Sequence, residues 1–272
     1  MPFTGAHVAA VLPFTRWALP PSALVIGSVV PDLPLYMPTP YSAAFSHQFA
    51  GAITVDAAAG LVILALWLTL VRPVVVLYAP TSLRRRITDP ATIPPLRFVP
   101  AMVLGSCTHI IWDAFTHANG WGVRRIPALT ARSGALPAFE WAQYASSLVG
   151  GTILLWWCVR WWRNTPEVDN AATEHQPTPG RTIAYTLITA GVTAGAAFGI
   201  WDGLHQPDPV RSALFHATTK GIDIGGLVVL SLGITHRIRR LRQHQTRPAD
   251  ASKRMCSCPR ERRNKGGHTQ RD

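Results

Sequence analysis

Long uncharged apolar stretches, separated by short polar segments, dominate the chain. A helix needs about 20 mostly apolar residues to cross the hydrocarbon core of a bilayer. Five stretches with few or no ionisable residues approach or reach this length, at residues 49–71, 98–112, 141–159, 182–201 and 212–235. We therefore predict an all-α fold, a polytopic membrane helical bundle with about five spans.

The N-terminal stretch has a different pattern. Residues 3–30 are apolar but are interrupted by Pro13 and by the pair Pro20 and Pro21. Because proline lacks a backbone donor and clashes with the preceding turn, neither half is long enough to span a membrane. We expect a re-entrant helix–turn–helix hairpin or one broken helix. A signal peptide fits poorly, since no basic region precedes the apolar run.

The composition supports a membrane protein, and the positive charge is concentrated near the C-terminus. Only 15% of the residues are charged, and the mean hydropathy is +0.16. The formal charge of +12 at first suggests nucleic acid as a partner. From His236 onward, however, twelve basic and three acidic residues give +9, so the preceding 235 residues carry only +3. The basic tail favours contact with anionic lipid over nucleic acid.

These patterns divide the chain into four predicted regions. Residues 1–163 form a membrane domain that carries the ionisable residues discussed below, and residues 164–181 form a polar linker. Residues 182–236 form two further membrane helices, and residues 237–272 form a basic disordered tail. The sequence leaves the oligomeric state open.

The positions of lysine and arginine predict the orientation in the membrane. Basic residues concentrate in cytoplasmic loops, so the C-terminal tail is expected in the cytoplasm of a multi-pass protein of the inner (plasma) membrane. The loop of residues 119–140 then lies outside, although it contains Arg124, Arg125 and Arg132. These three arginines conflict with the expectation that basic residues lie in cytoplasmic loops.

A few ionisable residues interrupt the apolar segments. Such groups are costly at membrane depth, so each is a functional candidate. The candidates in the first region are His7, Asp32, His47, His109, Asp113 and His117. One histidine near a helix end is usually a satisfied polar residue, but a hairpin at the N-terminus would bring all six to one level of the bundle. Imidazoles and carboxylates together favour Zn²⁺, with Mn²⁺ or Fe²⁺ as alternatives.

The spacing of the last three candidates separates their predicted functions. His109 and Asp113 are four residues apart, so they lie on one helix face and can share one ion. His117 lies about 12 Å of helical rise from His109. It would serve a second ion, orient a ligand, or act as acid or base. We therefore predict His7, Asp32, His47, His109 and Asp113 as metal ligands and His117 as the catalytic residue.

The motifs around these residues resemble a bacterial membrane family, domain of unknown function 4184. The resemblance rests on Met1-Pro-Phe-Thr-x-x-His7, Ser22-Ala-Leu-Val-Ile-Gly-Ser-x-x-Pro31-Asp32, Ser46-His47, His109-x-x-Trp112-Asp113-x-x-Thr116-His117 and Gln143-Tyr-x-Ser-Ser-x-x-Gly150. It covers residues 1–160 well and the later spans weakly.

The same order of residues is similar to the YdjM-like family, which is described as inner-membrane metal-dependent hydrolases, and more faintly to zinc-dependent phospholipase C. These similarities imply a phosphoester or lipid-linked substrate. The chain departs from the YdjM-like pattern, because Leu33 follows Asp32 and Gln48 follows His47. The resemblance therefore does not identify ligands for a second ion.

The main hypothesis is a metal-dependent hydrolase that acts on a lipid or lipid-linked (phospho)ester. A proton-relay transporter built on the same His and Asp residues, and a non-catalytic membrane scaffold, are the alternatives. A weaker group comprises Asp202, His205 and His216, which could join the site or lie at the membrane interface. Asp56 could orient a ligand, and Lys220 with Asp223 favours a structural ion pair.

Overall fold

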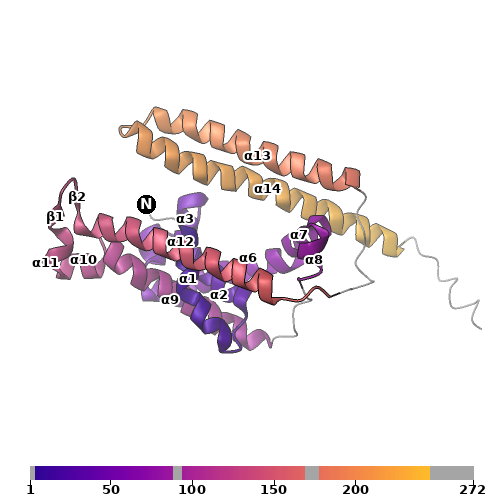
Figure 1. Cartoon of the computed structure of the whole chain (residues 1–272), viewed down its shortest axis with the longest axis horizontal. Helices are drawn as coiled ribbons and strands as arrows, with labels where there is room; N and C mark the ends of the chain where they lie inside the picture. The colour runs from indigo at the N-terminus through magenta and orange to yellow at the C-terminus, as the bar shows by residue number, and fades with distance from the viewer. Residues whose placement is uncertain (1–3, 88–93, 169–177, 246–272) are drawn as a thin grey trace, which may run out of the picture. The chain divides into compact units, whose positions relative to one another are not determined.

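The computed structural model describes residues 4–87, 94–168 and 178–245. These residues are almost entirely helical (Figure 1), which confirms the all-α prediction. The strands in the described part form one small antiparallel hairpin, of β1 (Arg132–Ser133) and β2 (Leu136–Pro137). The chain divides into two compact units, residues 1–233 and 234–272.

The N-terminal segment is a series of short helices that prolines begin or interrupt. Its elements are the 3-10 turn η1 (Thr4–His7), α1 (Val8–Val11), the 3-10 turn η2 (Leu12–Arg16), α2 (Pro21–Gly27), the 3-10 turn η3 (Val30–Asp32), α3 (Leu33–Tyr36) and α4 (Ala43–Ser46). The bend lies between η2 and α2, where Ala18 has a φ of 55° and its carbonyl accepts a hydrogen bond from Arg97. The expected break at the prolines is confirmed.

The first long apolar helix runs from Phe49 to Tyr78 and changes its winding twice. It consists of α5 (Phe49–Gly51), a π-helical turn η4 (Ala52–Asp56), α6 (Ala57–Leu66), a second π-helical turn η5 (Trp67–Val71) and α7 (Arg72–Tyr78). Single π-helical turns are rare and are often found near functional sites. The first of them ends at Asp56, whose side chain is fully buried.

The middle of the chain contains two long helices and several short ones. After α8 (Thr81–Arg84) and the 3-10 turn η6 (Pro95–Arg97), α9 extends from Phe98 to Thr116. It is followed by α10 (Trp121–Arg125), α11 (Pro127–Thr130), the β-hairpin and α12 (Ala138–Asn164).

Two further helices complete the described chain, α13 (Thr178–Leu204) and α14 (Pro209–Gln245). They approach each other at glycines, since a Cβ on Gly195 or Gly199 would collide with the backbone of α14. The helix α14 continues past His236, where we expected the tail to begin, because the arginines and leucine that follow favour helix. The rest of the predicted tail, with part of the predicted linker, lies outside the described residues.

Four helices are long and apolar enough to cross a membrane: Phe49–Tyr78, Pro95–Arg125, Gly180–Leu204 and Pro209–Gln243. They correspond to four of the five predicted spans, so the chain has the helices of a membrane protein. The remaining predicted span lies in α12, which has 27 residues but is not among these four. Its glutamine, serine and tryptophan side chains make it less apolar.

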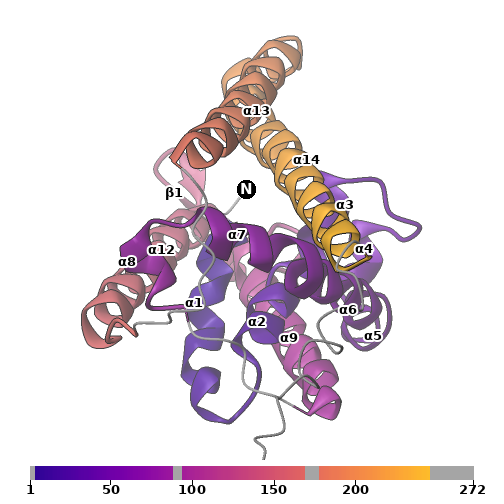
Figure 2. The same ribbon diagram turned by 90° about the vertical axis from the view of Figure 1, so that its right-hand side faces the viewer.

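The packing of α2 against α9 forms the centre of the N-terminal helices, and the two helices lie side by side in Figures 1 and 2. Glycines permit this close approach: a Cβ on Gly105 would lie 2.5 Å from the Leu24 carbonyl oxygen. Around this contact, small and apolar side chains make a core of Val11, Ala23, Leu24, Leu64, Ala101 and Met102. The same contact fixes the C-terminal half of α9 relative to the end of α2.

We expect Gly105→Ala to lower the free energy of unfolding by about 1–3 kcal/mol, because the added methyl group overlaps the backbone of α2. Thermal unfolding of detergent-purified protein would measure the change. Gly151→Ala in α12 is the matched control, because nothing lies within 4 Å of its Cβ position. Equal stability of the two variants would contradict this account of the α2–α9 contact.

Candidate metal centre

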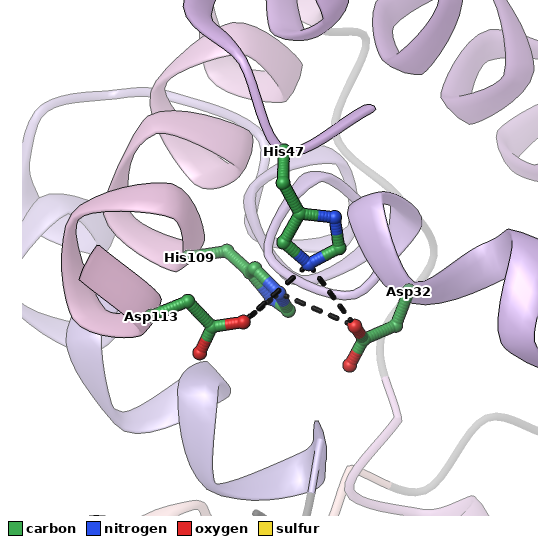
Figure 3. Close-up of side chains that lie close together, drawn as sticks. All are labelled: Asp32, His47, His109 and Asp113. Atoms are coloured by element: carbon green, nitrogen blue, oxygen red, sulfur yellow. Dashed lines mark ion pairs between the residues drawn. The ribbon is translucent and has the colours of Figure 1, made fainter. Parts of the chain in front are cut away.

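Four side chains from three separate segments converge at one end of the long apolar helices. Asp32 comes from η3, His47 directly follows α4, and His109 and Asp113 lie one turn apart on α9. One ligand atom from each residue lies within 4.8 Å of all the others. Figure 3 shows both imidazoles pointing towards the two carboxylates. The predicted convergence of these four residues is therefore present in the structure.

The distances within this cluster fit the spacing of ligands around one ion. The Nε2 atom of His47 lies 3.4 Å from both Asp32 Oδ1 and Asp113 Oδ2. The Nε2 atom of His109 lies 3.5 Å from Asp32 Oδ1 and 3.2 Å from Asp113 Oδ2. Two ligand atoms on a tetrahedral ion with bonds of 2.0–2.1 Å are about 3.3 Å apart. These four residues could hold a divalent metal ion.

Backbone carbonyls fix which nitrogen of each imidazole faces the carboxylates. His109 Nδ1 donates a hydrogen bond to the Ser28 carbonyl at 2.8 Å, and His47 Nδ1 donates to the Ala43 carbonyl at 2.8 Å. A carbonyl oxygen only accepts, so each Nδ1 carries the proton and each neutral ring has its lone pair on Nε2. Histidines that bind metals typically donate their other nitrogen in this way.

The buried imidazole of His109 gives the clearest evidence that a cation could bind in the cluster. His109 is completely buried, and its Nε2 has no hydrogen-bond partner within the described residues. The nearest polar atoms are carboxylate oxygens, which cannot donate a proton. An ion between the Nε2 lone pair and these oxygens would satisfy all three atoms.

Asp32 is held by a hydrogen-bonded chain that the sequence did not reveal. Thr4 Oγ1 donates to Asp32 Oδ2 at 2.7 Å, and Tyr36 donates to Thr4 Oγ1 at 3.0 Å. The chain orients the carboxylate so that its other oxygen, Oδ1, faces His47 and His109. Thr4 belongs to the N-terminal motif, but nothing in its type or spacing marked it as a partner of Asp32.

Neighbouring groups of opposite charge shift the pKa values of Asp32 and His47, the two candidate ligands that precede the long helices in the chain. Burial alone would raise the pKa of Asp32, but the neighbouring imidazoles of His109 and His47 hold that pKa well below its usual value. Burial alone would lower the pKa of His47, but the carboxylates of Asp113 and Asp32 raise it to about 10. A metal ion at this site would therefore compete with a proton on His47, as is usual for histidine ligands.

Two further predicted residues lie beside the cluster and contact the other oxygen of Asp113. His7 Nε2 is 3.5 Å from Asp113 Oδ1, and His117 Nδ1 is 3.3 Å from the same atom. We expected His117 on the helix, but α9 ends at Thr116 and His117 has an extended backbone, with φ −120° and ψ 142°. The ring turns back towards Asp113 for this reason. Its catalytic function stays a prediction.

The weaker candidates have other partners in the described part of the chain. His216 Nδ1 lies 2.7 Å from Asp202 Oδ2, and His205 Nδ1 lies 2.7 Å from the Trp201 carbonyl. Lys220 and Asp223 form the expected ion pair at 3.8 Å. The carboxylate oxygens of Asp56 are buried without a hydrogen-bond partner among the described residues. Within this part of the chain, Asp56 therefore does not make the expected hydrogen bond that would orient one of the candidate metal ligands.

Comparison with known proteins agrees with the resemblance seen in the motifs. The family model described as a domain of unknown function, DUF4184, matches residues 1–247. No curated protein and no solved structure matches the chain. The similarity to YdjM-like proteins stays a prediction.

We expect Thr4→Val to lower the free energy of unfolding by about 1–3 kcal/mol, because Asp32 Oδ2 loses its donor in a buried site. Thr4→Ser keeps the hydroxyl group and should retain most of the stability. Thermal unfolding of both variants in the same detergent would test the contact. A loss of stability in Thr4→Ser without a loss in Thr4→Val would show that the methyl group, and not the hydrogen bond, stabilises this segment.

Proposed function

The chain belongs to the DUF4184 family, and we propose that it is a membrane-embedded, metal-dependent hydrolase of a lipid or lipid-linked (phospho)ester. The observation that carries this proposal is the group of Asp32, His47, His109 and Asp113, whose Nε2 atoms and carboxylate oxygens face one another. A divalent ion bound there, with its coordination expanded beyond the four protein ligands, would polarise an ester or phosphoryl oxygen and activate water as a nucleophile. Zn²⁺ fits this ligand set, and Mn²⁺ and Fe²⁺ are the alternatives.

The protein residues would hold and shield the ion. His109 supplies an Nε2 whose direction the Ser28 carbonyl fixes, and Asp32 supplies an oxygen whose direction the Thr4 hydroxyl fixes. Because His109, Asp32 and Asp113 are less than a tenth exposed, water has little access from the protein side. Exclusion of water strengthens electrostatic contacts with a substrate.

The surroundings of the site support a lipid-like substrate. A large cavity reaches Asp32, His47, Asp113 and His117, and its wall near them is mostly apolar, with Val29, Leu33, Ile111 and Phe115. Arg124 lines the same cavity, and its guanidinium group could pair with a phosphate. An acyl or isoprenoid chain would lie against the apolar wall while its ester reaches the carboxylates and imidazoles.

We expect Asp32→Asn and His109→Gln each to reduce the affinity for Zn²⁺ or Mn²⁺ at least about 100-fold and to abolish metal-dependent hydrolysis. Metal content can be measured on the detergent-purified full chain. Hydrolysis can be measured as the release of water-soluble phosphoester or fatty acid from labelled phospholipid vesicles, with and without a chelator. Asp202→Asn is the matched control, because it removes a carboxylate that pairs with His216 outside the cluster.

Two results would contradict the proposal. Stoichiometric metal that survives in a His109→Gln, Asp113→Asn double variant would show that the ion binds elsewhere. Wild-type protein that takes up no metal at all would leave the cluster as a buried network of imidazolium and carboxylate groups, as a scaffold or a proton relay would use it.

We also propose that the protein lies in the inner membrane with its C-terminus in the cytoplasm, because the basic residues concentrate after His236. A fluorescent protein fused to the C-terminus should then fluoresce, whereas an alkaline phosphatase fused there should be inactive. The reverse pair of results would invert the proposed orientation.

A further inference from the structure

The two oxygens of Asp113 face two different pairs of imidazoles. Oδ2 lies 3.4 Å from His47 Nε2 and 3.2 Å from His109 Nε2, in the cluster described above. Oδ1 lies 3.5 Å from His7 Nε2 and 3.3 Å from His117 Nδ1. A single ion between Asp32, His47, His109 and Asp113 uses Oδ2 and leaves the second pair of imidazoles and Oδ1 without an explanation.

His7 is the strongest sign of an additional ligand. Its side chain is 1% exposed, and neither ring nitrogen has a hydrogen-bond partner in the described part of the chain. The ring stacks on His109 at 4.0 Å with an angle of 25° between the planes, and Trp112 covers its edge. A buried imidazole without a partner is costly, so a group that satisfies Nε2 is expected beside Asp113 Oδ1.

Close packing of α12 (Ala138–Asn164) against η1 holds His7 beside α9. A Cβ on Gly150 of α12 would lie 2.8 Å from the Ala6 carbonyl oxygen, so glycine is needed for α12 to pack against η1. This close packing fixes the residue before His7 and directs the imidazole towards α9. A histidine that served only to fill space would not need its Nε2 to face a carboxylate.

His117 approaches Asp113 Oδ1 from the cavity side. Its side chain is 34% exposed, and its other nitrogen, Nε2, lies 3.3 Å from the side-chain amide of Gln143. The oxygen and nitrogen of a glutamine amide exchange places by a simple rotation. With the oxygen towards His117, the amide accepts the Nε2 proton and leaves the Nδ1 lone pair facing Asp113.

We propose that Asp113 Oδ1, His7 Nε2 and His117 Nδ1 form a second divalent metal site, so that the carboxylate of Asp113 bridges two ions. This inference rests on the proposed function, because the first ion uses the other oxygen of the same carboxylate. The distances from Asp113 Oδ1 to His7 Nε2 and to His117 Nδ1, 3.5 and 3.3 Å, again match the separation of about 3.3 Å between two ligands of one ion. His117 is then a metal ligand and not a free base.

The two sites differ in what they offer to a substrate. Four protein ligands surround the first ion, whereas three surround the second, which leaves coordination positions for a substrate oxygen or water. His117 and Asp113 line the cavity, whereas His7 and His109 close the buried side. Pairs of ions that share a carboxylate are suited to phosphoesters, because they stabilise both the attacking and the leaving oxygen. The second site thus favours a phosphoester over a simple carboxylic ester.

The number of bound Mn²⁺ ions tests this proposal without an activity assay. The full chain is purified in detergent, stripped with a chelator and titrated with Mn²⁺, and free Mn²⁺ is counted by electron paramagnetic resonance. We expect two ions per wild-type chain, one in His117→Ala, and two in His205→Ala, which removes an exposed imidazole outside the cluster. His7→Gln should also bind one ion. Because His7 is buried, a melting curve must show that this variant is folded, and His117→Ala carries the test if it is not.

Spectra of the bound metal separate this proposal from the proposed function. Two Mn²⁺ ions that share a carboxylate should give a spin-coupled spectrum in the wild type, and His117→Ala should give that of an isolated ion. One wild-type ion that is lost in Asp32→Asn but kept in His117→Ala would overturn the second site and leave the proposed hydrolase intact. Two ions retained in His117→Ala would overturn the function of His117 as a ligand. A wild-type chain without Mn²⁺ would overturn both proposals.

Discussion

The carboxylate of Asp113 is the group on which the rest of the site depends. It lies at the C-terminal end of α9, is 7% exposed, and has imidazole nitrogens within 3.5 Å of both of its oxygens. A buried carboxylate is stable only if positive charge or hydrogen-bond donors surround it. The surrounding segments bring imidazoles to Asp113 that could hold a positive ion beside it: His7 from η1, His47 from the residue after α4, and His117 from the end of α9.

Glycine contacts in the apolar core determine where those groups lie. Gly105 permits α2 and α9 to approach until the end of α2 lies beside His109. Ser106 adds a hydrogen bond from its hydroxyl group to the Gly27 carbonyl at 3.1 Å. Both residues are on α9 within one turn of His109, so the packing that stabilises the two helices also orients the metal-facing imidazole. Stability and function are therefore coupled at this contact.

The sequence predicted the helical class and the four residues of the cluster because both depend on local patterns. Long apolar runs predict spans, and the four-residue spacing of His109 and Asp113 places them on one helix face. The sequence could not predict that α9 ends at Thr116, since no proline or glycine follows directly, and this end decides where His117 points. Nor could it predict the two π-helical turns before and after α6. The hydrogen bonds that join Tyr36, Thr4 and Asp32 were also not predictable, because they connect residues far apart in the chain.

Broken helices explain why this site is near the N-terminal segment and not in the middle of a regular span. In a continuous helix each interior carbonyl already accepts a backbone hydrogen bond, whereas the last carbonyls of a helix have no intrahelical partner. Ser28 caps the C-terminal end of α2, and its carbonyl accepts from His109. Membrane proteins tolerate such irregular backbone only where other groups satisfy it or where it lines a cavity. The end of α2 thus leaves the Ser28 carbonyl free to accept from His109, and this imidazole in turn satisfies a backbone group that lipid could not.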